Sequence, residues 1–119
     1  MKYLIMMFGD QATMMETRST EWIRSMIGFM KDLDHELRDA GEYVDGQGLV
    51  YPTQAKTVRF ESGAPVVTDG PFAEAKESLA GYWIVDVQED RALEIASRIV
   101  AFIEGPIEVR QIADAPPEY

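Results

Sequence analysis

Apolar and polar residues follow two patterns along the chain: alternation, which predicts strands, and a spacing of three and four, which predicts helices. Residues 2–8 are apolar on both alternating faces, which is typical of a strand that is buried on both sides. From a cap at Ser19 or Thr20, apolar residues recur at spacings of three and four, which predicts a helix that ends near Gly41. Residues 89–103 have the same spacing, with one apolar and one charged face, and predict a second helix.

The other predicted strands are short and are separated by turn residues. They are residues 42–50, 56–60, 64–68, 82–87 and 107–112. Gly46 and Gly48 interrupt the first of these and indicate a bulge or a close approach of backbones. Glu61-Ser62-Gly63 joins the next two as a hairpin. Gly9 and Asp10 are expected to end the first strand, a polar connection is expected between them and the first helix, and residues 113–119 are expected to form a tail.

The order of these elements predicts the fold. It reads strand, helix, strand, inserted hairpin, strand, helix, strand. Without the hairpin this is the βαββαβ order of ferredoxin-like α+β folds, in which an antiparallel sheet carries both helices on one face. Because residues 2–8 are apolar on both faces, the other face needs a cover, and a second copy of the chain is the simplest candidate. We therefore expect one domain over residues 1–119 that forms a homodimer.

Composition and charge exclude several kinds of protein. The 119 residues include no cysteine and one histidine, so cysteine-based metal sites, thiolate nucleophiles and poly-histidine metal sites within a single chain are excluded, and no metal or organic cofactor is expected. The net charge of −10 opposes binding to nucleic acid or to an anionic membrane. No apolar run is long enough to span a membrane, and we expect a cytoplasmic protein.

The charge is also unevenly distributed along the sequence. Residues 1–60 carry 7 basic and 9 acidic groups, a net charge of −2, whereas residues 61–119 carry 4 and 12, a net charge of −8. An acidic ligand bound near the second half would need local help from a cation such as Lys76 or Arg59.

The segment TDGPFAEAKESLAGYW, residues 68–83, gathers acidic, basic and aromatic groups between the hairpin and a buried strand. Asp69 either caps the turn or acts at a pocket as a general base or ligand anchor. Glu74 and Glu77 form either a solvated or intersubunit charge cluster or part of a ligand site. Lys76 is a candidate cation for an acidic ligand or a partner for Asp69.

Three further residues have both a structural and a functional interpretation. Tyr82 and Trp83 should point to opposite faces of their strand, so that one lines the pocket while the other packs beneath the helices. Arg59 either points outward from its strand or clamps a carboxylate with its guanidinium fork. His35 lies on the polar side of the first helix, which is typical of an ordinary surface histidine.

The same segment resembles the signature of DGPF-type proteins in the YCII-related family. The matching residues are Asp69-Gly70-Pro71-Phe72, Glu74, Lys76-Glu77 and Gly81-Tyr82, and the likeness extends to Gly46-Gln47-Gly48-Leu49, Thr57-Val58-Arg59 and Ile107-Glu108-Val109-Arg110. The resemblance implies a dimeric α/β-barrel in which two sheets face each other and leave a pocket between sheet and partner. It also implies an aspartate, here Asp69, that would act with a histidine. His35 is not a clear counterpart of that histidine.

Two functions follow as hypotheses. The first is a small-molecule-binding protein or enzyme with its pocket near Asp69, for which the residues define no reaction class. The second is a regulatory protein that acts with an extracytoplasmic-function sigma factor in transcription, because the resemblance implies such a gene neighbourhood. In that role the acidic surface would meet a basic partner, without direct contact to DNA.

Overall fold

The computed structural model describes residues 1–72, 74 and 77–116. Its elements, in chain order, are β1 (Lys2–Phe8), α1 (Gln11–Thr17), α2 (Thr20–Asp39), β2 (Tyr43–Gly48), the short 3₁₀ helix η1 (Pro52–Gln54), β3 (Lys56–Glu61), β4 (Ala64–Asp69), β5 (Leu79–Asp86), α3 (Glu89–Ile103) and β6 (Ile107–Gln111).

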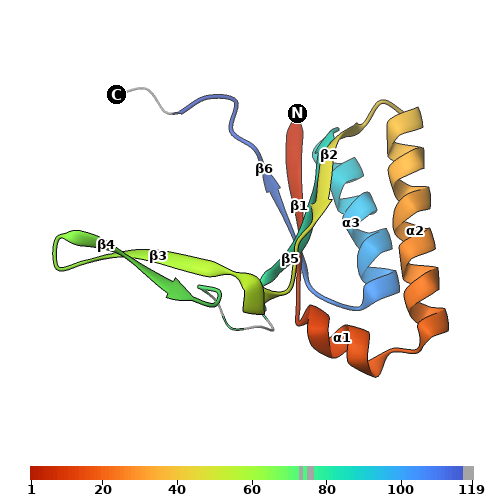
Figure 1. The fold of residues 1–119 in the computed structure, drawn as a ribbon. Coiled ribbons are helices and arrows are strands. Elements are labelled where there is room, and N and C mark those ends of the chain that lie inside the picture. The colour runs from red at the N-terminus through yellow and green to blue at the C-terminus, as the bar shows by residue number, and fades with distance from the viewer. Residues whose placement is uncertain (73, 75–76, 117–119) are drawn as a thin grey trace.

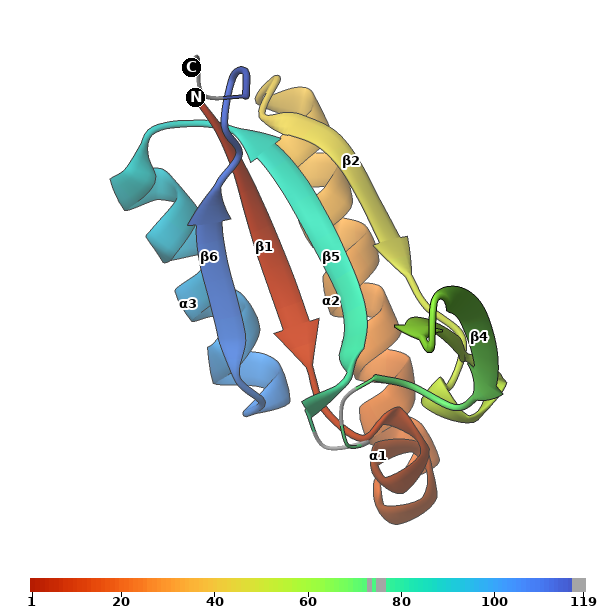
Figure 2. The same cartoon turned by 90° about the vertical axis from the view of Figure 1, so that its left-hand side faces the viewer.

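Four strands form one antiparallel sheet in the order β2-β5-β1-β6. Helices α2 and α3 lie side by side on one face of this sheet (Figures 1 and 2). In both views α1, α2 and α3 leave the opposite face of the sheet free. The predicted ferredoxin-like arrangement is therefore confirmed.

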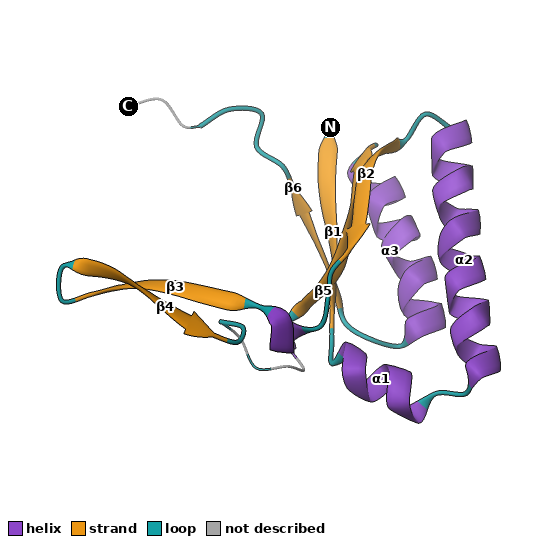
Figure 3. Ribbon diagram, in the orientation of Figure 1, coloured by secondary structure: helices purple, strands orange, loops and turns teal. Residues whose placement is uncertain are grey.

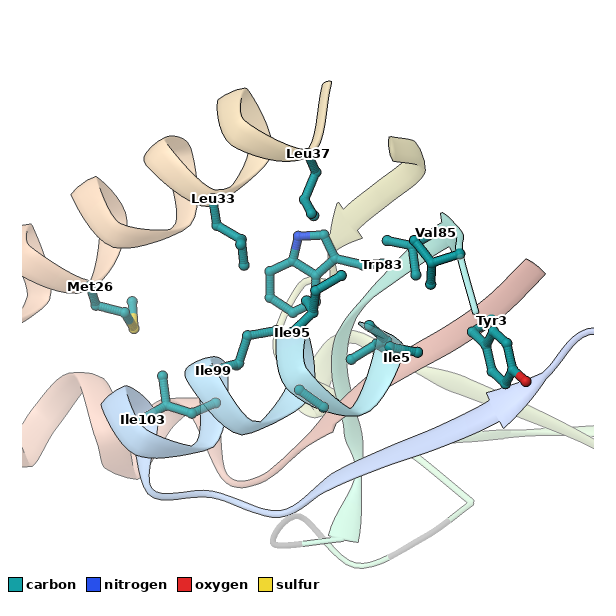
Figure 4. Packing of buried hydrophobic residues seen from close by; sticks show 13 residues of the cluster. Tyr3, Ile5, Met26, Leu33, Leu37, Trp83, Val85, Ile95, Ile99 and Ile103 are labelled. Atoms are coloured by element: carbon teal, nitrogen blue, oxygen red, sulfur yellow. The ribbon is translucent and has the colours of Figure 1, made fainter. Parts of the chain in front are cut away.

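The core lies between the sheet and these two helices. Ser19 caps α2, its Oγ accepting a hydrogen bond from the Trp22 backbone amide at 3.1 Å. Figure 4 shows the side chains of both helices converging on the strand residues beneath them. The largest fully buried side chains are Ile5, Leu33, Leu37, Val85, Ile95 and Ile99. Val100 departs from the predicted apolar face of α3 and is 40% exposed, because it sits about 100° around the helix from Ile99.

Two sequence predictions at the base of the sheet were wrong. The expected polar connection contains helix α1, which begins after Asp10 because that carboxylate accepts hydrogen bonds from the backbone amide and the hydroxyl of Thr13 at 3.2 and 2.8 Å. Strand β5 begins at Leu79, three residues earlier than predicted, because Leu79 continues the ladder opposite Phe8.

Of the two alternatives predicted for the glycines of β2, the close approach of backbones is the one found there. A bulge is present as well, but it lies before the glycines, where the register of β2 against β5 shifts between Tyr43 and Asp45. A Cβ at Gly46 would lie 3.2 Å from Cδ1 of Trp83, and one at Gly81 of β5 would lie 2.9 Å from the Gln47 carbonyl oxygen. The two strands approach closely because neither glycine carries a side chain there.

The predicted hairpin is confirmed as a separate two-stranded sheet of β3 and β4, which we call the arm (residues 56–69). Ser62 and Gly63 form its turn, with φ values of 50° and 81° that suit a tight hairpin. The arm extends away from the four-stranded sheet on the side opposite α2 and α3 (Figures 1 and 3). It therefore stands beside the sheet face that these helices leave open.

Candidate functional site

The open face of the four-stranded sheet is apolar at its centre. Leu4 and Met6 of β1 are half-buried on this face, and their ladder partners Ile84 and Tyr82 of β5 lie beside them. On the other side of β1, Tyr3 and Ile5 are buried against the helices. One face of β1 is thus covered within the chain, and the other is only half covered by the described residues.

A hollow of about 900 Å³ lies where the arm leaves the sheet, and we call it the arm hollow. Its walls come from the end of β1, the connection from β2 to β3, the start of β3, and the segment that follows β4. The apolar lining includes Phe8, Leu49, Tyr51, Val58 and Phe72. A hollow of this size and lining is typical of small-molecule sites.

Two cations and one acidic residue also line the arm hollow: Lys56, Arg59 and Glu77. The guanidinium carbon of Arg59 lies 5.8 Å from the centroid of the Phe72 ring, and its Nη1 lies 3.5 Å from the hydroxyl of Thr68. Both cations come from β3, so the arm brings positive charge to this hollow.

Asp69 ends β4 directly opposite Lys56 and forms an ion pair with it. Its carboxylate is 85% exposed. It lines a shallow neighbouring hollow of about 580 Å³ together with Glu74 and the rest of the DGPF turn, which we define as residues 69–72. The turn is held to the arm at Gly70, whose amide donates to the Ala55 carbonyl at 2.8 Å. Because Asp69 is exposed and ion-paired, burial does not prepare it as a general base.

The remaining predicted charged site residues of this segment are Lys76, Glu74 and Glu77. Lys76 lies outside the described residues. The Glu74 carbonyl accepts hydrogen bonds from the Glu77 amide at 2.8 Å and from the Ser78 hydroxyl at 3.0 Å. Glu74 lines the hollow of Asp69, and Glu77 lines the arm hollow.

Tyr82 and Trp83 point to opposite faces of β5, as predicted. Trp83 is buried on the helix side, where its Nε1 donates to Oδ1 of Asp34 at 2.9 Å. The Tyr82 hydroxyl donates to Oδ2 of Asp45 at 3.0 Å, and this hydrogen bond to a carboxylate raises the pKa of Tyr82. Tyr82 lines a separate cavity of about 120 Å³ and not the hollow of Asp69.

The single histidine is not brought to the DGPF turn. His35 is exposed on α2, which covers the face of the sheet opposite the arm (Figure 1). A dyad of His35 and Asp69 therefore does not form within the chain.

Sequence reasoning missed Lys56, although a signal for it was present. A two-residue turn at Ser62-Gly63 pairs Glu61 with Ala64, and counting back along both strands places Lys56 opposite Asp69. The aromatic lining from Tyr51 had no comparable signal, because it depends on how the connection between β2 and β3 folds.

Two general properties of the described residues bear on the site. In that part of the chain, no group of three or more His, Asp or Glu residues is placed to hold a metal ion. Among the described helices, none has the length and apolar character needed to cross a membrane.

The family model of the YCII-related domain matches residues 1–116. The chain belongs to the YCII-related family. An uncharacterized protein of Rhizobium meliloti (strain 1021) is 34% identical over 100 residues, which cover 81% of this chain and 77% of that protein. The match to the YCII-related domain includes the four-stranded sheet, the arm and the DGPF turn, so the arm belongs to the family domain.

Proposed function

We propose that this YCII-related protein binds a small molecule in the arm hollow, and that the molecule carries one carboxylate beside an aromatic or branched apolar group. The observation that carries this proposal is the placement of two cations, Arg59 and Lys56, against one acidic residue, Glu77, on a mainly apolar lining, in a chain with a net charge of −10. The proposal concerns binding and assigns no reaction.

Arg59 is the principal anchor for the carboxylate. Its guanidinium group can bind both carboxylate oxygens, and Phe72 beside it offers a ring for the apolar part of the ligand. Lys56 is already paired with Asp69, which leaves it a supporting role. Glu77 lines the same hollow and disfavours a second negative charge, so a monoanion fits better than a dianion.

A second copy of the chain completes this site in our proposal. A two-stranded sheet alone is marginally stable in water, and the arm exposes apolar side chains, among them Val58, Phe60 and Val67 at 64%, 75% and 64%. The open sheet face offers Leu4 and Met6 as a complementary apolar surface. Because one chain carries both surfaces, a two-fold dimer can cover both at once and enclose the hollow between them.

Calorimetric titration with phenylacetate and benzoate tests the ligand class. The native protein should bind these carboxylates more tightly than phenylacetamide and benzamide, their uncharged amides. Arg59→Gln should lose about tenfold or more in affinity, because a charge-assisted pair is removed. Arg98→Gln is the matched control, since Arg98 pairs with Glu36 on the helix side of the molecule. Equal binding of acids and amides, or unchanged binding by Arg59→Gln, would contradict the proposal.

A partnership with an extracytoplasmic-function sigma factor is the second candidate function. The observation in its favour is the net charge of −8 on residues 61–119, which suits a basic protein partner. Titration of a purified sigma factor from the same genome tests it. Salt-sensitive binding would support the partnership, and no binding at low salt would exclude it for that sigma factor.

A further inference from the structure

The four-stranded sheet ends at β6, and no described strand pairs with the outer edge of that strand. Figure 2 shows β6 at the side of the sheet away from the arm, with α3 running beside it. The Ile112 amide donates to the Lys2 carbonyl at 2.8 Å, so the even-numbered residues along this strand direct their backbone groups toward β1. The amides and carbonyls of the alternate residues Ile107, Val109 and Gln111 therefore point outward. Such an edge is a template for another strand.

An apolar groove of about 470 Å³ lies between α3 and β6, and we call it the edge groove. Ile107 and Val109 line it from β6, and Leu93 and Val100 line it from α3. Leu93 and Val100 are seven residues apart, which places them on one flank of the helix, and they are 50% and 40% exposed. This side of the molecule thus offers backbone hydrogen-bonding groups and an apolar surface next to each other.

The charges of β6 indicate a second copy of the chain as the occupant of this edge. Glu108 and Arg110 lie on the open face of the sheet, on either side of Val109 in the sequence. In a two-fold antiparallel pair of β6 strands centred on Val109, Glu108 of each copy lies opposite Arg110 of the other. A shift of two residues in either direction would place Glu108 opposite Glu108 or Arg110 opposite Arg110. The charges therefore favour one register.

The backbone pattern fits the same register. Opposed residues of antiparallel strands alternate between pairs that exchange two hydrogen bonds and pairs that exchange none. In the register centred on Val109, the outward groups of Val109 meet those of its own copy, and those of Ile107 meet those of Gln111. Glu108 and Arg110 then occupy the pairs without hydrogen bonds, in which opposed side chains lie closest.

We propose that β6 strands of two copies pair antiparallel about Val109, so that two four-stranded sheets become one continuous sheet. Within one chain, Nη2 of Arg110 lies 2.6 Å from Oε2 of Glu108, and the pairing gives each of these groups a second partner of opposite sign. A charge on an edge strand discourages pairing when a second copy brings the same sign against it, which does not occur in this register. The contact leaves both open sheet faces uncovered, so it is independent of the dimer that encloses the arm hollow.

Charge reversal tests the pairing with a rescue that requires contact between chains. Glu108→Arg leaves two cations on β6 and Arg110→Glu leaves two carboxylates, so each variant meets like charges in its own pair. Each alone should associate about tenfold or more weakly than the native protein in sedimentation equilibrium. An equimolar mixture should recover native association, although the ion pair within each chain stays broken. Native association by either variant alone, or no recovery in the mixture, would overturn the proposal.

Disulfide formation tests the register and separates it from a contact between open sheet faces. The native chain has no cysteine, so introduced thiols have no competitor. Mixed Glu108→Cys and Arg110→Cys chains would carry their thiols on opposed residues, whose Cα atoms lie about 4.5 Å apart in such pairs. A disulfide spans that distance, whereas sheets that pack face to face lie about 10 Å apart.

Under mild oxidation, this mixture should form a heterodimer much faster than either cysteine variant forms a homodimer. Absence of the heterodimer would overturn the pairing, and homodimers that form as fast would overturn the register.

Substitution in the edge groove tests the part played by α3. Val100→Gln should weaken association about tenfold, because both copies lose an apolar side chain from the contact. Ile27→Gln is the matched control, since Ile27 of α2 is 44% exposed and lies outside the groove. It should associate like the native protein. Equal association by the two variants would overturn the assignment of the groove to this contact.

Discussion

Replacing Gly81 with alanine tests the close packing of β5 against β2, which positions Tyr82 and the end of the sheet beside the arm. A Cβ at Gly81 would lie 2.9 Å from the Gln47 carbonyl oxygen and 3.4 Å from Cα of Gly48. Both atoms are backbone, so β2 has to move. Such overpacking costs about 1–3 kcal/mol. For a domain of this length that corresponds to a fall in Tm of about 4–12 °C.

Gly48 provides the matched control, because it is the ladder partner of Gly81 and a Cβ there has open space. Gly48→Ala should leave the stability unchanged or raise it by up to about 1 kcal/mol, since alanine restricts the unfolded chain. Thermal unfolding followed by circular dichroism compares the variants at one protein concentration, because self-association would make Tm depend on concentration. A native Tm for Gly81→Ala, or an equal loss for Gly48→Ala, would refute the packing argument.

Three further predictions concern the helices. Arg98 donates a hydrogen bond to Glu36 at 2.7 Å and lowers the pKa of Glu36 below its ordinary value of 4.5. The ion pair therefore stabilises the fold fully above pH 4.5, and this stabilisation is lost as the pH falls through the lowered pKa of the folded state. Glu36→Gln should reduce the urea midpoint at neutral pH and leave it unchanged in strong acid. Asp34→Ala should cost about 1–3 kcal/mol and shift tryptophan emission, because the buried Trp83 N–H loses its acceptor; native emission and stability would contradict this. Ser19→Ala should cost about 1 kcal/mol through loss of the cap, measured by urea unfolding, and Ser19→Asp should restore it.

The long helices could be predicted from the sequence because their signal is local. Each repeats apolar residues over several turns, and Ser19 marks the start of α2. Helix α1 has seven residues, too few to show a reliable period, and begins at a side-chain cap. The spacing of Asp10 and Thr13 was the available signal for that cap.

The candidate site was only partly predictable because its contacts depend on register and on chain direction. In a regular strand, Tyr43 and Asp45 would both point to the helix side of the sheet, because they are two residues apart. The bulge moves Asp45 opposite Ile84 on the open face, where it reaches the Tyr82 hydroxyl. The direction of the arm is set by the connections at its base, including the hydrogen bond from the Gly70 amide to the Ala55 carbonyl. No periodicity within the strands encodes that contact.

In our proposal the arm hollow is a ligand site on the open side of the sheet and a second copy of the chain encloses it. A crystal structure of the full chain grown with phenylacetate is the decisive measurement. We expect two copies whose open sheet faces meet, with the carboxylate of the ligand on Arg59 and its ring beside Phe72. Copies that meet only through α2 and α3, with phenylacetate absent from the hollow, would contradict it.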